Sequence, residues 1–227
     1  MKRIACITAL IAATAWSTSA MAEVDGFKWF LADQSYHIKL DYLNLTRSVD
    51  EGALIAEMAE HGHEVDPDLG TSARGWQLVT EMRLRPHLGV ELGFVQIDSP
   101  GHQISAVTSD EEDLVERLVQ RLPVSASGVT LGVGSSMTFA QLFSLDGAMA
   151  ERMRLRARGG LFSWDGEVRS RWDGQVASRR RSGIDPYFGL GFGLDLGRQL
   201  EVMLEYQHLG ADWDQAGLSV GMRYQYW

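Results

Sequence analysis

The sequence predicts an all-β protein, an eight-stranded antiparallel up-and-down transmembrane β-barrel with short helices in its surface loops. Apolar and polar residues alternate with a period of two in eight separate segments, which is typical of strands that divide two environments. The connections between these segments alternate between long and short, as surface loops and periplasmic turns do in outer-membrane barrels. The chain also begins with the pattern of a secretory signal peptide.

The N-terminal segment predicts export. A basic start precedes an apolar run at residues 4–15, which is too short to span a bilayer and is followed by small residues typical of a cleavage site. We therefore expect residues 1–22 to be a cleaved signal peptide and residues 23–227 to form one outer-membrane barrel domain. Cys6 is the only cysteine and leaves with the signal peptide, so no internal disulfide is expected.

The charge of the chain argues against nucleic acid as a partner. The formal net charge is −9, and loss of Lys2 and Arg3 with the signal peptide makes it −11. Binding to nucleic-acid phosphates requires a basic face instead. No apolar segment of helix-spanning length follows residue 22, so the period-two pattern decides the location. We predict the outer membrane of a Gram-negative bacterium, with both mature termini in the periplasm.

The first four strands are predicted at residues 36–42, 76–85, 88–94 and 129–135. The first alternates tyrosine, isoleucine and leucine with histidine, lysine and aspartate. The second and third have glutamine, glutamate, arginine and glycine on the polar side, and only about three residues separate them, which predicts a hairpin. The fourth sets threonine and glycine against valine and leucine. Each pattern fits a strand with one apolar face.

The last four strands are predicted at residues 153–161, 186–197, 200–208 and 218–226. The fifth strand carries three arginines on its polar side, and the sixth carries glycine at every second position. The seventh sets glutamate, methionine and glutamine against leucine, valine and tyrosine, and the eighth follows the same scheme. Eight is an even number, as closed bacterial barrels require. The links are about 30, 3, 30, 10, 20, 4 and 7 residues long, a rhythm that a soluble sandwich does not explain.

Charged residues of these strands are predicted to fill the barrel lumen. In a closed barrel the apolar face points to lipid, and eight strands leave an interior just wide enough for side chains. Gly189, Gly191 and Gly193 would leave room for the arginines of the fifth strand. The six basic and six acidic residues on the inward face are Lys39, Asp41, Glu81, Arg83, Glu91, Arg154, Arg156, Arg158, Asp195, Glu201, Glu205 and Arg223. Because unpaired buried charges are costly, we expect these side chains to pair across the lumen and plug it.

Two surface loops carry helical patterns. Residues 48–64 open with Ser48, a predicted N-cap, and Glu51 follows three residues later, as in a capping box. Residues 109–122 place Ser109 before an acidic first turn and an apolar face. Two interpretations are open for both helices: a lid packed over the barrel mouth, or a docking face for another protein or for lipopolysaccharide.

The third surface loop is predicted to extend as a hairpin. Trp-Asp-Gly occurs at residues 164–166 and again at 172–174. We interpret the two copies as the two arms of the hairpin, with both tryptophans near the membrane interface. The basic cluster at 178–183 is either a solvated loop tip or a site for the phosphates of lipopolysaccharide.

Three segments, at residues 160–168, 185–210 and 218–227, resemble the transmembrane barrel of the outer membrane protein A family and its short relatives. The resemblance implies that the barrel assembly machinery recognises the C-terminal strand through its alternating apolar positions and aromatic end. The residues of this insertion signal are Tyr224, Tyr226 and Trp227, of which Trp227 is one residue beyond the family pattern. The peptidoglycan-binding domain of the full-length relatives, with its role at the cell wall, is not expected here.

No cofactor, metal or catalytic site is predicted. His61 and His63 lie among glutamates, but helical zinc ligands are usually spaced by four residues, and Gly62 would break that helix. His208 is placed near the outer rim of a strand. Gly210, however, stands where a lipid A deacylase would have its serine, and no nucleophile, base and acid come together.

We therefore expect a structural and surface-interaction protein rather than an enzyme. Its predicted partners are outer-membrane lipids and lipopolysaccharide, the barrel assembly machinery, and a surface ligand held by the loops. A narrow pore and a lipid A-modifying enzyme are the alternatives.

Overall fold

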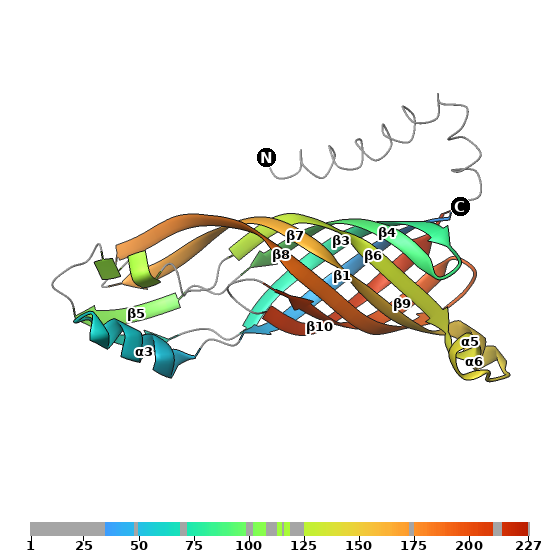
Figure 1. Ribbon diagram of the computed structural model, residues 1–227, viewed down its shortest axis with the longest axis horizontal. Helices are drawn as coiled ribbons and strands as arrows, with labels where there is room; N and C mark the ends of the chain where they lie inside the picture. Colours follow the sequence, from blue (N-terminus) through green and yellow to red (C-terminus); the bar gives the residue numbers. More distant parts are fainter. Residues whose placement is uncertain are drawn as a thin grey trace, which may run out of the picture. The chain divides into compact units, whose positions relative to one another are not determined.

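The barrel wall consists of eight strands in the computed structural model (Figure 1). The structure describes residues 35–47, 50–68, 72–98, 102–107, 113–114, 116–118, 125–172, 175–210 and 215–226. The predicted signal peptide lies outside these residues. The strands of the wall are β1 (Tyr36–Arg47), β3 (Ser72–Arg85), β4 (Leu88–Asp98), β6 (Ser125–Thr138), β7 (Met153–Trp172), β8 (Gln175–Asp195), β9 (Leu200–Leu209) and β10 (Gln215–Gln225).

Every pairing within the wall is antiparallel. The strands follow the order β7-β6-β4-β3-β1-β10-β9-β8, and β7 pairs with β8 to close the sheet. The predicted fold class, an all-β eight-stranded antiparallel barrel, is therefore confirmed. Closure pairs the backbone N–H and C=O groups of what would otherwise be two sheet edges, and this is the condition that lets strands cross lipid.

Two further strands lie outside the wall, and the sequence did not predict them. β2 (Glu64–Asp68) pairs with β5 (His102–Val107), and β5 adds in parallel to the far part of β7. Both strands belong to loops for which only helices were expected. β2 contains Pro67, which fits an edge strand because proline has no N–H to donate to a ladder.

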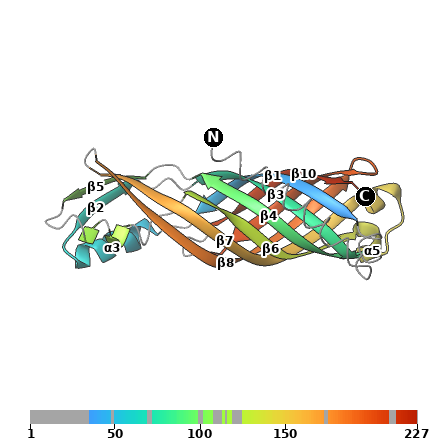
Figure 2. The same ribbon diagram turned by 90° about the horizontal axis from the view of Figure 1, so that it is seen from above.

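The two ends of the barrel differ in their connections. The end that holds the start of β1 and the end of β10 has short turns at residues 86–87 and 196–199. It also has a helical hairpin, α5 (Phe139–Phe143) and α6 (Ala148–Arg152), between β6 and β7. The opposite end holds the loops that contain α3 (Glu51–Glu60), β2 and β5 (Figure 1, Figure 2).

The third loop is a direct continuation of the wall. β7 has 20 residues and β8 has 21, and the two remain paired as far as Trp172 and Gln175. The first Trp-Asp-Gly copy and the tryptophan of the second therefore share one strand, so the assignment of the copies to two arms is wrong. Trp164 points into the barrel, where it is buried and donates a hydrogen bond to Asp185, and its predicted place at the membrane interface is also wrong. The basic cluster at 178–183 belongs to β8 instead of a loop tip.

The outer surface of the wall is apolar over a broad belt. Large apolar side chains point outward and are about half exposed, as in Leu40 (50%), Leu190 (53%) and Val220 (55%). Aromatic side chains lie among them, and the rings of Trp76 and Phe94 are 5.4 Å apart. An apolar outer belt with aromatic residues is the arrangement of a transmembrane β-barrel.

The alternation changes phase toward the end that holds α3. On β1, Lys39 and Asp41 point inward, but the next inward residues are Leu43 and Leu45, while Asn44 between them is exposed. Inward apolar residues at the same end of other strands include Val95, Ile97, Phe162 and Leu209. Beyond this level the barrel has an apolar inside and a more polar outside, as a water-soluble β-barrel does.

Helices cover this apolar core. Leu54 and Met58 of α3 are buried in the same cluster as the strand residues. Leu114 and Leu118, from helical residues of the second loop, join the cluster as well. The packing of both loops therefore matches the lid interpretation.

The start of α3 differs from the prediction. Its N-cap is Asp50, whose side chain accepts a hydrogen bond from the Ala53 N–H at 3.0 Å, in place of the predicted Ser48. Ser48 itself and Ser109, the cap predicted for the second helix, lie outside the described residues. Within the described part of the chain, no helix has the length and apolar character needed to cross a membrane.

Candidate functional site

All twelve charged residues predicted for the lumen lie on the inward face of the wall. Nine of them are buried. The other three, Arg83, Arg154 and Asp195, are partly exposed at the end of the lumen where β1 begins and β10 ends. Strand geometry explains the placement. Alternate residues of a strand share one face, and when the apolar face of a closed barrel points outward the polar face lines the lumen.

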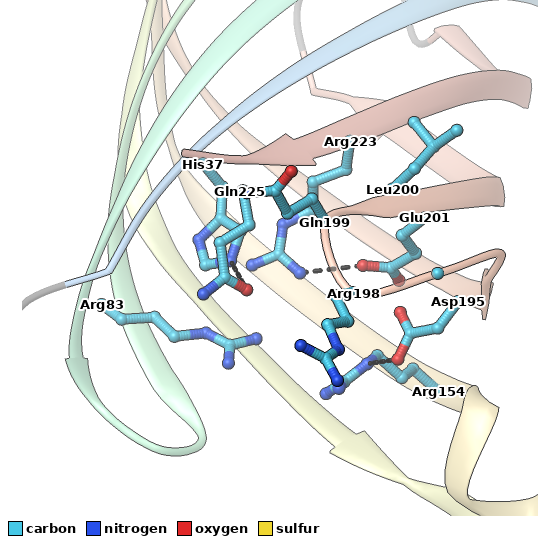
Figure 3. A pocket seen from close by; sticks show the side chains of 11 residues that line it. His37, Arg83, Arg154, Asp195, Arg198, Gln199, Leu200, Glu201, Arg223 and Gln225 are labelled. Atoms are coloured by element: carbon cyan, nitrogen blue, oxygen red, sulfur yellow. Dashed lines mark hydrogen bonds and ion pairs between the residues drawn. The ribbon is translucent and has the colours of Figure 1, made fainter. Parts of the chain in front are cut away.

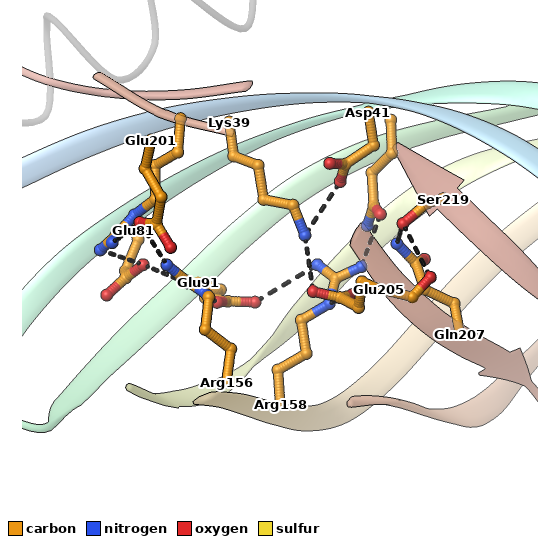
Figure 4. Close-up of polar contacts among 12 residues, drawn as sticks. Lys39, Asp41, Glu81, Glu91, Arg156, Arg158, Glu201, Glu205, Gln207 and Ser219 are labelled. Carbon is orange, nitrogen blue, oxygen red and sulfur yellow. Dashed lines mark hydrogen bonds and ion pairs between the residues drawn. The ribbon is translucent and has the colours of Figure 1, made fainter. Parts of the chain in front are cut away.

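The first ionic cluster contains Arg156 and Arg223 (Figure 4 shows Arg156 with its partners). Arg156 donates a hydrogen bond to Glu81 at 2.9 Å, and it lies 3.5 Å from Glu201 and 3.7 Å from Glu91. Arg223 donates to Glu201 at 2.8 Å and to Glu81 at 2.9 Å. Two guanidinium groups thus share two carboxylates, and Arg156 reaches a third.

The second ionic cluster contains Arg158 and Lys39 (Figure 4). Arg158 donates to Glu205 at 2.6 Å and lies 3.5 Å from Glu91. Lys39 contacts Glu205 at 2.9 Å and Asp41 at 3.0 Å. Glu91 also belongs to the first cluster, so the two clusters form one network across the lumen.

Neutral polar side chains complete the network, and they were not among the predicted site residues. Arg158 donates to the Gln77 side-chain oxygen at 2.6 Å, and its guanidinium carbon lies 5.5 Å from the centre of the Tyr187 ring. Gln207 donates to the Ser219 hydroxyl at 2.8 Å. Their signal in the sequence is the same alternation, since Gln77, Gln207 and Ser219 each stand two or four residues from a lumen charge.

Glycines on the bare face of β8 make room for this network. The pairs across the β7–β8 register are Arg154–Gly193, Arg156–Gly191 and Arg158–Gly189. A Cβ atom at Gly189 would lie 2.6 Å from a Glu205 oxygen and 3.1 Å from Arg158 Nε. A Cβ atom at Gly193 would overlap the carboxylate of Glu201. The space that glycine leaves is therefore occupied by the glutamates of β9 and by Arg158.

A polar cavity of about 50 Å³ lies at the end of the lumen where β1 begins and β10 ends (Figure 3). At this cavity Arg154 donates to Asp195 at 2.9 Å. Glu201 and Arg223, which belong to the first ionic cluster, also line the cavity. The ionic network therefore begins directly at this opening.

In the lids over the apolar core, Asp113 connects the residues that follow α3 with the helical residues of the second loop. Arg117 donates to the Asp113 carboxylate at 2.7 Å, and His63 Nε2 lies 2.9 Å from the same oxygen. The hydrogen bonds from Arg117 and His63 lower the pKa of the Asp113 carboxyl group from 3.8 to about 2. His61 instead places Nδ1 2.9 Å from the Glu57 carbonyl oxygen. Across the described residues, no group of three or more histidine, cysteine, aspartate or glutamate side chains is arranged to hold a metal ion.

The predicted insertion signal lies on and just after β10. Tyr224 points outward and is exposed. The Tyr226 N–H donates to the Tyr36 carbonyl at 3.1 Å, and the two rings stack at 6.0 Å. Trp227 lies outside the described residues.

These features define the class of the protein as a transmembrane β-barrel whose lumen contains paired charges. No family model matches the chain, and no curated protein matches it. Similar solved structures include the attachment invasion locus protein Ail of Yersinia pestis, at 15% identity and a TM-score of 0.45, over 85% of this chain and 98% of that chain. Neisserial surface protein A is 10% identical with a TM-score of 0.45, over 84% and 97% of the two chains. The N-terminal β-barrel domain of Pseudomonas aeruginosa OprF is 8% identical with a TM-score of 0.40, over 84% and 97%.

Proposed function

We propose that the protein is an integral outer-membrane protein with a structural and surface-interaction role, and that paired charges close its lumen to solutes. The observation that carries the proposal is the pairing of the buried lumen charges. Arg156, Arg158, Arg223 and Lys39 each contact at least two carboxylates within the wall. A solute that passes would have to break these contacts in a region of low water content, where an unpaired charge is costly.

The apolar core supports closure independently of the ionic network. Leu43, Leu45 and Phe162 fill the inside of the barrel next to the charged region, and all three are fully buried. The lids of α3 and the second loop pack on the same core. Ions and polar solutes that enter from the end where β1 begins would meet the ionic network first and the apolar core second.

The apolar belt and the connections support the membrane location. Closed antiparallel barrels with an even strand number are the spanning structures of the bacterial outer membrane, with short turns on the periplasmic side and long loops outside. The short turns of this barrel lie at the end where β1 begins and β10 ends. We therefore assign that end to the periplasm, in agreement with the resemblance to the outer membrane protein A family.

The surface-interaction role rests on the part of the barrel beyond the phase change. There the long β7–β8 hairpin, β2, β5 and the lids make a packed structure with its own apolar core. The exposed Arg180 on β8 belongs to the basic cluster at 178–183. We propose that this cluster binds the phosphates of lipopolysaccharide, and that the C-terminal strand is recognised by the barrel assembly machinery.

Planar-bilayer recording tests closure. The folded protein should be nearly silent, and a steady large conductance would refute the plug. The control is heat-modifiable migration on a gel, because it shows that the recorded sample is folded. Membrane fractionation tests the location separately, and recovery of the protein as a soluble species would refute the whole proposal.

The two alternatives have weaker support. The cavity at the lumen end is the feature that favours a pore, but its lining includes the first ionic cluster. For catalysis the candidate is His208, whose ring stacks on Phe188 at 4.5 Å on the outer side of the wall. Because the His208 ring lies on the outward, apolar face of the wall, we propose no catalytic role for it.

A further inference from the structure

We propose that the α5–α6 hairpin lies in the headgroup region of the membrane leaflet on the side where β1 begins and β10 ends, and that it holds a phospholipid acyl chain against the barrel wall. The inference rests on the proposed membrane location of the barrel. It adds a lipid site at one side of the wall, formed by a connection that is longer than the other two at this end.

The hairpin is a defined structure. A capping box starts α5: the Thr138 hydroxyl accepts from the Gln141 N–H at 3.2 Å, and the Gln141 side chain accepts from the Thr138 N–H at 3.1 Å. Ser144 ends α5 in the left-handed region at φ 53°, and Gly147 takes φ 134° before α6 begins. These contacts hold the apolar residues of the connection in one arrangement.

The apolar side chains of the hairpin are uncovered. Neither helix has a buried residue, and Phe143, Leu145 and Met149 are 59%, 51% and 63% exposed. A cluster of large exposed apolar side chains marks a contact with protein or membrane. A short element of this kind at the rim of a lipid belt is suited to the membrane interface.

The hairpin also contacts the lipid-facing wall. The ring of Phe139 lies 5.4 Å from that of Phe143 and 6.1 Å from that of Phe192, which points outward from β8. Beside this contact is a groove of about 450 Å³ with an almost entirely apolar lining. The groove residues that carry the argument are Met149 of α6, Met153 at the start of β7, and Phe192, Leu194, Val202 and Leu204 on the wall.

An acyl chain is the occupant that this groove fits. Leu194 and Leu204 belong to the apolar belt, so the groove is continuous with the surface that lipid chains cover in the proposed location. Water would find no hydrogen-bond partners there. Arg152, exposed at the end of α6, stands next to the groove residue Met153 and can extend its guanidinium toward a lipid phosphate.

Spin labels on single cysteines test the position of the hairpin in vesicles of phosphatidylethanolamine and phosphatidylglycerol. With Cys6→Ser as background, Leu145→Cys reports on the hairpin, Val133→Cys on the outward wall, and Ser182→Cys on the opposite end. Val133→Cys should be accessible to oxygen and protected from a water-soluble nickel complex, and Ser182→Cys should show the reverse. Leu145→Cys, in the headgroup region, should be clearly better protected from nickel than Ser182→Cys.

The three labels separate the two proposals. If the Leu145 label is as accessible to nickel as the Ser182 label while the Val133 label is protected, the barrel spans the membrane and the hairpin proposal is overturned. If the Val133 label is also accessible to nickel, the membrane location fails and the lipid site fails with it.

A phospholipid with a photoreactive group in its acyl chain tests the groove in the same vesicles. Adducts should concentrate on Met149 and Met153, several-fold above those on Met82, an outward residue of β3 on another part of the wall. The variant Met149→Glu should remove this enrichment and leave Met82 unchanged. Equal labelling of the three methionines in the wild-type protein would overturn the acyl-chain site, even if the hairpin is in the membrane.

Discussion

Replacing Arg156 with alanine should strongly destabilise the barrel. Arg156 is 3% exposed and contacts the carboxylates of Glu81, Glu91 and Glu201. Without it, the six acidic residues of the lumen face one basic residue fewer. A buried charge left without its partner costs about 3–5 kcal/mol, and this is the expected fall in the free energy of unfolding.

The neighbouring cations set the upper limit of the effect. Glu81 and Glu201 keep their contacts with Arg223, and Glu91 keeps Arg158 at 3.5 Å. The variant should therefore still fold, which makes its stability measurable. Arg156→Lys keeps the charge but not the reach to three carboxylates, so it should recover part of the loss.

Urea unfolding in lipid vesicles, followed by tryptophan fluorescence, measures the effect. Arg154→Ala is the matched control, because Arg154 lies two positions away on β7 and its pair with Asp195 has both side chains 23% exposed. Partly exposed pairs of this kind are worth about 1 kcal/mol or less. Equal losses for the Arg156 and Arg154 variants would refute the argument that burial makes the network costly to break.

Three further predictions concern other parts of the molecule. Gly193→Ala should cost about 1–3 kcal/mol of stability because the new Cβ overlaps Glu201. Gly197→Ala should be neutral, because a Cβ there meets no atom within 4 Å apart from those of its own chain neighbours. Equal unfolding midpoints for the two variants would contradict this prediction. Met58→Ala should destabilise the lid by about 2–5 kcal/mol, seen as faster hydrogen exchange in α3 with the lumen strands unchanged; unaltered exchange in α3 would show that the lid does not depend on this contact. Because folding lowers the pKa of Asp113 from 3.8 to about 2, the stability that this carboxylate contributes is complete above about pH 4 and is lost as the pH falls toward 2. Exchange in α3, corrected for its intrinsic pH dependence, should rise over that interval in the wild-type protein, and the same rise in Asp113→Asn would exclude this carboxylate as the cause.

The inward placement of the lumen charges follows from local sequence. Side chains of a strand alternate between two faces, and a closed wall has one inside, so the position of Arg156 relative to Arg154 and Arg158 is set by spacing alone. The same reasoning places Glu201 and Glu205 on the same face of β9, with Met203 between them. The charged face is the inner one, because the apolar residues that alternate with these charged residues must face lipid.

The phase change on β1 shows the limit of this reasoning. Leu43 and Leu45 continue the alternation that Lys39 and Asp41 begin, but with apolar residues on the inward face. The pattern of the sequence is equally regular on both sides of this point. Its meaning reverses because the wall leaves the lipid belt, and the place where it does so depends on the heights of all eight strands together.

The partners of the network also depend on the assembled barrel. Arg156 and Glu81 are 75 residues apart in the chain, and Lys39 and Glu205 are 166 apart. Composition shows that acids and bases balance in the lumen, but the register of each strand pair decides which ones meet. A shift of one strand by two residues would keep every side chain on its face and still exchange its partners, because period two leaves height along the barrel undefined.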